Sequence, residues 1–314
     1  MTAPTVPSQS PSERGFDTPD SPEAVAAGLR AHGYLPDEGL ATVIFLALAL
    51  RRPLLLEGEA GVGKTEVAKV LARWTGGELI RLQCYEGIDA SQALYEWDYT
   101  RQLLHLRTAE AAGTAAGQAD ELENELYSER FLVRRPVLAA ISSAAAVPPV
   151  LLVDEIDRAD DEFEAFLLEV LSDYSVTIPE LGTYTAAVPP VVIITSNRTR
   201  DVHDALKRRC LYHWVEHPDL EREIEIIDLK TTTCGAELTR QVATAVEAMR
   251  EMGLYKPPGV AESIDWAESL ARLGVADLDE ASVRSTLGAV LKYREDQARV
   301  QSSVGELLSM ISGA

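Results

Sequence analysis

Cysteine, basic residues and long apolar runs are all scarce in this sequence of 314 residues, and each shortage excludes a class of protein. The three cysteines, Cys84, Cys210 and Cys234, lie far apart and lack the close spacing of zinc ligands. We therefore expect reduced thiols and no disulfide framework. The 29 Lys and Arg are outnumbered by 50 Asp and Glu, so the formal net charge is −21. This charge argues against nucleic acid as a partner, because a phosphate backbone is bound by clustered Lys and Arg.

The apolar runs are too short to cross a bilayer. The longest, Ala41–Leu50, is about half of the ~20 residues that a spanning helix needs, so we expect no integral membrane segment. Residues 1–20 are rich in Pro, Ser and Thr and contain no apolar stretch, which differs from a secretory signal and predicts a disordered tail. Together these two absences lead us to expect a cytoplasmic location.

Short apolar segments alternate with helical patterns in the first two thirds of the sequence. Four buried strands are expected, at Pro53–Glu57, Leu79–Gln83, Val150–Val153 and Val191–Thr195. Such alternation predicts an α/β fold, a mostly parallel sheet sandwiched by helices. Two inserted β-hairpins are expected at 91–107 and 174–188, and helices at 109–126 and Pro136–Ala146.

Strand patterns stop near His217, and the remaining sequence consists of helical patterns separated by Gly and Pro. The predicted division is therefore a tail over 1–20, an α/β nucleotide-binding domain over 21–217 and a smaller all-α lid domain over 218–314.

Residues 58–65 match the phosphate-loop pattern G-x-x-x-x-G-K-[ST], with an apolar strand before it and a helical pattern after it. The glycines let backbone N–H groups surround phosphate oxygens, and the helix N-terminus adds its positive end. Lys64 would neutralise the phosphates of ATP and Thr65 would bind Mg²⁺. A chance glycine loop would lack this strand and helix. The predicted nucleotide-binding residues are Gly58, Glu59, Ala60, Gly61, Val62, Gly63, Lys64, Thr65, Glu66 and, flanking the adenine, Tyr34, for which a place in the core is the alternative.

A second motif, Val150–Glu155, is an apolar strand that ends in two acids about 90 residues after the phosphate loop. Asp154 would hold Mg²⁺ through water, and Glu155 would take a proton from the attacking water. For the acids that follow, a solvated start of a helix is the favoured interpretation; they are Asp157, Asp160, Asp161 and Glu162.

Two further features carry candidate catalytic residues. Asn197 ends the strand at 191–195 and could orient the attacking water, although a polar residue in a turn is an equal alternative. Arg208 and Arg209 follow the last expected strand and could stabilise charge on a transferring phosphoryl group in a neighbouring subunit. On their own, the two arginines would more simply form surface ion pairs.

These motifs, in this order, resemble the Walker A, Walker B, sensor 1 and arginine-finger regions of AAA+ ATPases. Narrower stretches resemble MoxR-type ATPases and, within them, the CoxD-like accessory ATPases of carbon-monoxide dehydrogenase maturation; these stretches are Leu54–Thr65, Arg81–Gly87, Tyr95–Trp97 and Leu206–Trp214. The resemblance covers residues from about 25 to about 300.

The resemblance implies an ATP hydrolase that uses ATP and Mg²⁺ and assembles as a homo-oligomer, by family expectation a hexamer. It implies that the two hairpins face the ring pore or a partner. It also implies a partner with a von Willebrand factor A domain and a client metalloenzyme, a molybdenum-containing dehydrogenase whose metal cofactor is assembled with this help.

One departure from the family pattern concerns the lid. Many AAA+ lids carry an arginine, called sensor 2, early in a lid helix, where this chain has Glu262. Either another residue supplies that charge, with Arg272 and Arg284 as the candidates, or the coupling of the lid to the nucleotide is altered.

Two rival functions share the phosphate loop. A small-molecule kinase or a nucleotide switch is disfavoured by Glu155, Asn197 and the helical C-terminal region. An inactive scaffold that binds nucleotide only to assemble is disfavoured because every catalytic position is filled.

Overall fold

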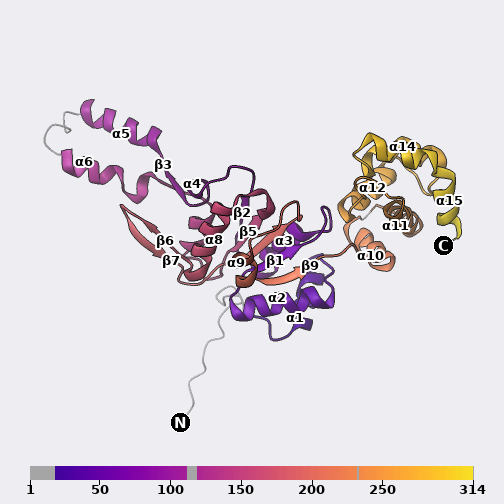
Figure 1. The fold of residues 1–314 in the computed structure, drawn as a ribbon, viewed down its shortest axis with the longest axis horizontal. Coiled ribbons are helices and arrows are strands. Elements are labelled where there is room, and N and C mark those ends of the chain that lie inside the picture. The colour runs from indigo at the N-terminus through magenta and orange to yellow at the C-terminus, as the bar shows by residue number, and fades with distance from the viewer. Residues whose placement is uncertain (1–17, 112–118, 232, 314) are drawn as a thin grey trace, which may run out of the picture.

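The computed structural model describes residues 18–111, 119–231 and 233–313 (Figure 1). Most of the predicted N-terminal tail lies outside them. The centre of the fold is a parallel sheet of five strands in the order β2-β5-β8-β1-β9, as the α/β prediction requires. Its strands are β1 (Leu54–Glu57), β2 (Leu79–Gln83), β5 (Val150–Asp154), β8 (Val191–Ser196) and β9 (Leu211–Trp214). The edge strand β9 is the one that the apolar pattern did not indicate, because it is short and contains Tyr and His.

Helices cover both faces of this sheet, so its central strands are apolar on both sides. Leu54 and Leu56 of β1 join the core that includes residues of α1 (Pro22–Ala31), α2 (Glu38–Leu50) and α3 (Lys64–Thr75). Leu55, between them, joins the core on the other face. That core includes residues of α7 (Pro136–Ile141), α8 (Asp161–Asp173) and α9 (Asp204–Arg209). The alternation follows from the strand period of two residues.

Asp37 caps the N-terminus of α2 and ties it to the sheet. Its carboxylate accepts a hydrogen bond from the amide of Leu40 at 2.6 Å and lies 3.4 Å from Nε2 of His213 on β9. Burial alone would raise the pKa of Asp37, but the contacts with His213 and Leu40 and the charge of Arg222 hold this pKa at about 2.

Asp37→Ala is expected to lower the free energy of unfolding by about 1–2 kcal/mol, because the cap and the tie to β9 are lost together. The folded-state pKa lies below the usual value, so the stabilisation from Asp37 is present above about pH 4 and is lost as the pH falls toward 2. Urea unfolding at pH 7 and at pH 3 checks this. An equal effect of the substitution at both pH values would contradict the linkage.

The hairpin predicted over 91–107 is wrong. Only Tyr95–Trp97 (β3) is a strand, and it pairs antiparallel with the distant Leu132–Arg134 (β4). Asp98 then accepts a hydrogen bond from the amide of Arg101 at 2.9 Å and starts α5 (Tyr99–Ala111). The short alternation in 91–107 fits both a strand and a helix, and the cap at Asp98 decides locally for the helix.

The two strands β3 and β4 form the base of an inserted helical pair that projects away from the sheet (Figure 1). Its members are α5, most of which lies in the region predicted as a hairpin, and α6 (Ala119–Leu126), which lies within the predicted helix 109–126. Residues 112–118 between them lie outside the described residues. A short helix, α4 (Ala90–Ala93), leads into β3. The predicted helix Pro136–Ala146 is shorter than expected and ends at Ile141 as α7.

The second predicted hairpin is present. Strands β6 (Ser175–Ile178) and β7 (Gly182–Thr185) pair antiparallel directly after α8, with Val176 opposite Tyr184. Tyr174 adopts a left-handed conformation with φ 47°, which ends α8 and redirects the chain into β6. The hairpin therefore extends from a helix that starts beside the acids after β5.

The C-terminal region is helical, as predicted, and its buried apolar residues form a core of their own, with Trp266 fully buried. Its helices are α10 (Leu220–Lys230), α11 (Ala236–Glu251), α12 (Val260–Arg272), α13 (Glu280–Val290), α14 (Arg294–Ser302) and α15 (Val304–Gly313). In the described part of the chain, no helix combines the length and the apolar character needed to span a membrane. The domain boundary at 217/218 stays a prediction.

Candidate functional site

The phosphate loop connects β1 to α3 and leaves the first amides of that helix open. Gly63 is the N-cap, with φ 95° and no side-chain cap, so the N–H groups of the first turn face the loop. Gly61 has φ 84°, and a Cβ there would lie 2.9 Å from Oε2 of Glu262 and 3.1 Å from Cα of Gly259. Glycine is thus required at Gly61 because the start of α12 packs directly on the loop. The loop has the backbone shape that binds phosphate.

The ammonium group of Lys64 is enclosed by the loop. Its side chain donates hydrogen bonds to the carbonyl oxygens of Gly58 at 2.7 Å and Glu59 at 2.6 Å, and the residue is 6% exposed. Burial lowers the pKa of Lys64 to about 8, although Asp157, Asp154 and Glu155 oppose that shift. A cation held among these groups can bind a phosphate anion at short range.

Asp154 and Thr65 lie together at the carboxyl end of β5. The Thr65 hydroxyl donates to Oδ1 of Asp154 at 3.0 Å, and the Thr195 hydroxyl donates to the same oxygen at 2.6 Å. A hydroxyl and a carboxylate beside a phosphate loop are the hard oxygen ligands that Mg²⁺ prefers. These two residues fit the magnesium site that the sequence predicts.

Glu155 is held by two side-chain amides. Nδ2 of Asn197 donates to Oε1 at 3.0 Å, and Nε2 of Gln83 donates to Oε2 at 3.1 Å. The backbone at Glu155 has φ 58°, and its amide donates to the Thr195 hydroxyl at 2.9 Å. A non-glycine residue is strained in this conformation, and such strain is concentrated at functional sites. The carboxylate is fixed where it can accept a proton from water.

Sequence reasoning missed Gln83 and Arg81 on β2. Arg81 donates through Nε and Nη2 to Oδ2 of Asp154, at 3.0 and 2.5 Å, and through Nη2 to Gln83 at 2.5 Å. The two residues therefore link Asp154 to Glu155 across the sheet edge. The polar residues near the end of β2 were the signal in the sequence, but only the pairing of β2 with β5 places them beside Asp154 and Glu155.

A cavity of about 480 Å³ lies between the phosphate loop and the helical region. The loop residues Ala60–Thr65, together with Glu66, Asp154, Glu155 and Asn197, line it, whereas Gly58 and Glu59 do not. Tyr34 lines the cavity and also packs against the core beside α2, and burial raises its pKa. Its place beside the adenine stays a prediction.

The helical region contributes different cations to this cavity from those expected. Arg222 and Lys230 of α10 line it, whereas neither Arg272 nor Arg284 does. Lys230 lies 3.2 Å from Oε1 of Glu66 on α3. Arg272 lies at the C-terminal end of α12, and only the N-terminal end of that helix meets the phosphate loop.

A family model described as AAA domain (dynein-related subfamily) matches residues 53–210, which is about half of the chain. This chain belongs to the dynein-related subfamily of AAA domains. The membership confirms the AAA+ class that the motifs predicted, and the narrower MoxR-type and CoxD-like resemblance stays a prediction.

The similar solved structures are distant, with 15% identity and TM-scores below 0.5. No curated protein sequence matches the chain. The Holliday junction branch migration motor RuvB of Thermotoga maritima is 15% identical, over 85% of this chain and 68% of its own, with a TM-score of 0.43. A crystal structure of a candidate ATPase from Cytophaga hutchinsonii is 15% identical over 93% of each chain, with a TM-score of 0.46.

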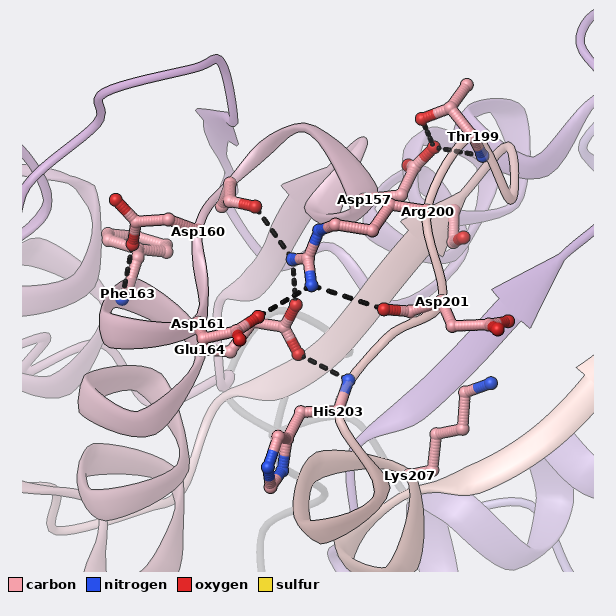
Figure 2. A network of polar contacts seen from close by, with 12 residues as sticks. Asp157, Asp160, Asp161, Phe163, Glu164, Thr199, Arg200, Asp201, His203 and Lys207 are labelled. Carbon is pink, nitrogen blue, oxygen red and sulfur yellow. Dashed lines mark hydrogen bonds and ion pairs between the residues drawn. The ribbon is translucent and has the colours of Figure 1, made fainter.

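In this AAA domain, Asp157 is buried rather than part of a solvated helix start. It accepts hydrogen bonds from the amide and the hydroxyl of Thr199, at 3.0 and 2.6 Å (Figure 2). It also accepts one from the amide of Asn197 at 3.1 Å. Burial would raise the pKa of Asp157, but these hydrogen bonds lower it below its usual range. Asp157 thereby fixes the backbone that carries Asn197.

The loop after Asn197 is tied to α8 by a second acid. Glu164, 1% exposed, pairs with Arg200 and accepts a hydrogen bond from the amide of His203 at 2.7 Å (Figure 2). Arg200 also contacts Asp161 at 2.8 Å. Of the four acids expected at a solvated helix start, Asp160 caps α8, and Asp161 and Glu162 are exposed.

The two candidate arginines of the AAA domain, Arg208 and Arg209, lie on α9 outside the cavity, and both are exposed. Arg209 donates to the carbonyl of Ser172 at 2.6 Å, and their neighbour Lys207 lies 3.8 Å from Glu57. The guanidinium group of Arg208 makes no hydrogen bond or ion pair with any residue that the structure describes.

Proposed function

We propose that this chain is a Mg²⁺-dependent ATP hydrolase that works as a ring and remodels a partner protein. One observation carries the proposal. Lys64, Asp154, Glu155 and Asn197 converge on a single cavity beside an open helix N-terminus. Each makes a hydrogen bond with another residue of the site.

The residues of the cavity divide the reaction among them. Lys64 and the open amides of α3 bind the β- and γ-phosphates. Thr65 and Asp154 would hold Mg²⁺, Asp154 through water, and the ion would supply positive charge against the developing charge on the phosphates. Asn197 orients water and Glu155 takes its proton as the water oxygen bonds to the γ-phosphorus. The bond from that phosphorus to the bridging oxygen breaks, leaving ADP and phosphate.

We propose Arg208 as the residue that completes the site of a neighbouring subunit. An arginine at the γ-phosphate stabilises the charge of the transition state and is often supplied by another subunit. Arg208 is exposed and unpaired within the described chain, whereas Arg209 is bonded to Ser172. A hexameric ring, the family expectation, would repeat this contact at every interface.

The partner and client follow from the narrower resemblance. The stretches Arg81–Gly87 and Tyr95–Trp97 support a MoxR-type, CoxD-like ATPase that acts with a von Willebrand factor A protein. The client would be a molybdenum-containing dehydrogenase, such as carbon-monoxide dehydrogenase, whose metal cofactor it helps to assemble. Co-purification of both proteins with the tagged chain tests this assignment, and recovery of neither would contradict it.

Lys64→Ala is expected to weaken Mg²⁺-ATP binding by roughly a hundredfold, because a cation buried against the phosphates is removed. Titration of a fluorescent ATP analogue with and without Mg²⁺ measures the affinity. Lys256→Ala is the matched control, since Lys256 is exposed and lies away from the cavity. Unchanged affinity in the Lys64 variant would remove the proposed function.

A small-molecule kinase or nucleotide switch remains the alternative at the level of chemistry. It predicts no sustained phosphate release from ATP and Mg²⁺ alone. Steady release without any phosphate acceptor would exclude the kinase.

A further inference from the structure

Arg52 lies at the junction between α2 and β1 and is fixed by the backbone around it. Arg51 ends α2 in a left-handed conformation with φ 52°, and the amides of both arginines donate to the carbonyl of Ala47. The Tyr174 hydroxyl donates to the Arg51 carbonyl at 3.3 Å. Directly after Arg52, the carbonyl of Pro53 accepts from the amide of Leu211 at 2.8 Å. The guanidinium group of Arg52 therefore extends from a stretch of backbone that hydrogen bonds hold on both sides.

The guanidinium group of Arg52 caps the C-terminal end of α9. Nε donates to the Arg209 carbonyl at 3.1 Å, and Nη2 lies 3.0, 2.9 and 3.3 Å from the carbonyls of Arg208, Arg209 and Cys210. Carbonyls at a helix end have no partner inside the helix and carry the negative end of its dipole. A cation with several donors satisfies both needs at once.

Helix α9 depends on such external contacts because it has only six residues. At its N-terminal end, the amide of His203 is held by Glu164 at 2.7 Å. Leu206 is buried between the two ends. The helix is thus fixed at both termini, at its C-terminal end by Arg52. The exposed residue Arg208 projects from this fixed helix.

Two simpler roles for Arg52 do not fit these contacts. It does not line the cavity, so it does not bind the nucleotide of its own subunit. No carboxylate of the described residues lies within ion-pair distance of it, so it is not one half of a surface salt bridge. Its contacts are with the backbone that carries Arg208.

We infer that Arg52 is a positioning residue that sets the direction in which Arg208 reaches the neighbouring subunit. The inference rests on the proposed function, in which Arg208 acts on ATP bound next door. Arg52 directly precedes β1, and β1 leads into the phosphate loop. The contact between Arg52 and α9 therefore also connects the phosphate loop of one subunit to the arginine that acts on the next subunit.

Arg52→Gln is expected to reduce ring turnover roughly ten- to a hundredfold, because a small displacement of a catalytic group has effects of that size. The affinity for Mg²⁺-ATP should stay at the wild-type value, since the cavity is untouched. Arg52→Lys should recover part of the loss, as it keeps the charge but not the fork of donors. Arg51→Gln is the matched control, because it removes the same charge from the next residue without releasing α9.

Mixing two impaired variants separates positioning from general damage to the fold. The Arg52→Gln variant keeps Glu155 but no longer positions Arg208. The Glu155→Gln variant lacks the base in its own site but still positions Arg208. In a ring assembled at random from equal amounts, about a quarter of the interfaces place a subunit with Glu155 beside a neighbour with Arg52. Turnover should therefore rise above that of either variant alone. Arg208→Gln mixed with Glu155→Gln provides the reference for full recovery by this route.

The outcomes are distinct. Recovery in both mixtures supports the role of Arg52. Recovery with Arg208→Gln but not with Arg52→Gln would show that Arg52 acts within its own subunit, and the inference would be overturned while the proposed function stands. No recovery in either mixture would overturn the arginine supplied in trans, and with it the role of Arg52. Full turnover of Arg52→Gln alone would also overturn the inference.

Discussion

Glu155→Gln is expected to leave Mg²⁺-ATP binding close to wild type and to reduce hydrolysis by about 10²–10⁴-fold. The glutamine has nearly the same shape, so the cavity, the phosphate loop and Asp154 are preserved. Its amide cannot take a proton from water. In the wild type, the side-chain amides of Gln83 and Asn197 donate to the two carboxylate oxygens of Glu155. In the variant, only the one amide oxygen of the glutamine could accept a hydrogen bond from them. Phosphate release under saturating ATP, together with a nucleotide titration, separates the two effects.

Glu162→Gln is the matched control for this experiment, because Glu162 is an exposed acid in the first turn of the nearby helix α8. The control should hydrolyse ATP at the wild-type rate. If the Glu155 variant turned over at that rate too, the assignment of the general base would be wrong. If it also lost ATP binding, Glu155 would be shown to support the cavity itself.

Arg208→Gln is expected to reduce hydrolysis by the assembled ring by roughly 10³–10⁵-fold. The variant keeps its own phosphate loop, both acids and Asn197, so its affinity for Mg²⁺-ATP should be retained. Every site would lack the positive charge that a neighbour supplies to the transition state. The turnover per subunit should also rise with protein concentration in the wild type and stay low in the variant at every concentration.

Arg209→Gln tests the choice between the two arginines. Arg209 is bonded to the Ser172 carbonyl, so its loss should loosen α9 and lower turnover less than the loss of Arg208. The reverse order of effects would reassign the role to Arg209. Wild-type rates in both the Arg208 and the Arg209 variant, with the ring intact by sedimentation, would mean that neither arginine of α9 serves a neighbouring site.

The sequence predicted well those parts of the site that are set by local chemistry. A glycine loop between an apolar strand and a helix commonly binds phosphate. The positions of Lys64 and Thr65 depend on that loop alone. Asp154 and Asn197 were expected at strand ends, and parallel strands bring their carboxyl ends to one edge of the sheet. The structure accordingly places them beside the loop.

The errors arose where a short pattern fits two structures or where the partner is distant in sequence. In 91–107 the alternation fits a strand, but the cap at Asp98 starts a helix, and β3 finds its partner at residues 132–134. Asp157 was expected to be solvated because the acids around it are. Its burial depends on the amides of Asn197 and Thr199, about 40 residues away.

By itself, therefore, the sequence determined the class of protein, the phosphate-binding loop and the acids that follow β5, since these depend on neighbours along the chain. Only the tertiary structure decided that Gln83 holds Glu155, that Arg222 and Lys230 line the cavity in place of the expected lid arginines, and that Arg52 caps α9. Each of these contacts joins segments far apart in sequence. Pairing at that range is set by how strands and helices pack, which no local pattern records.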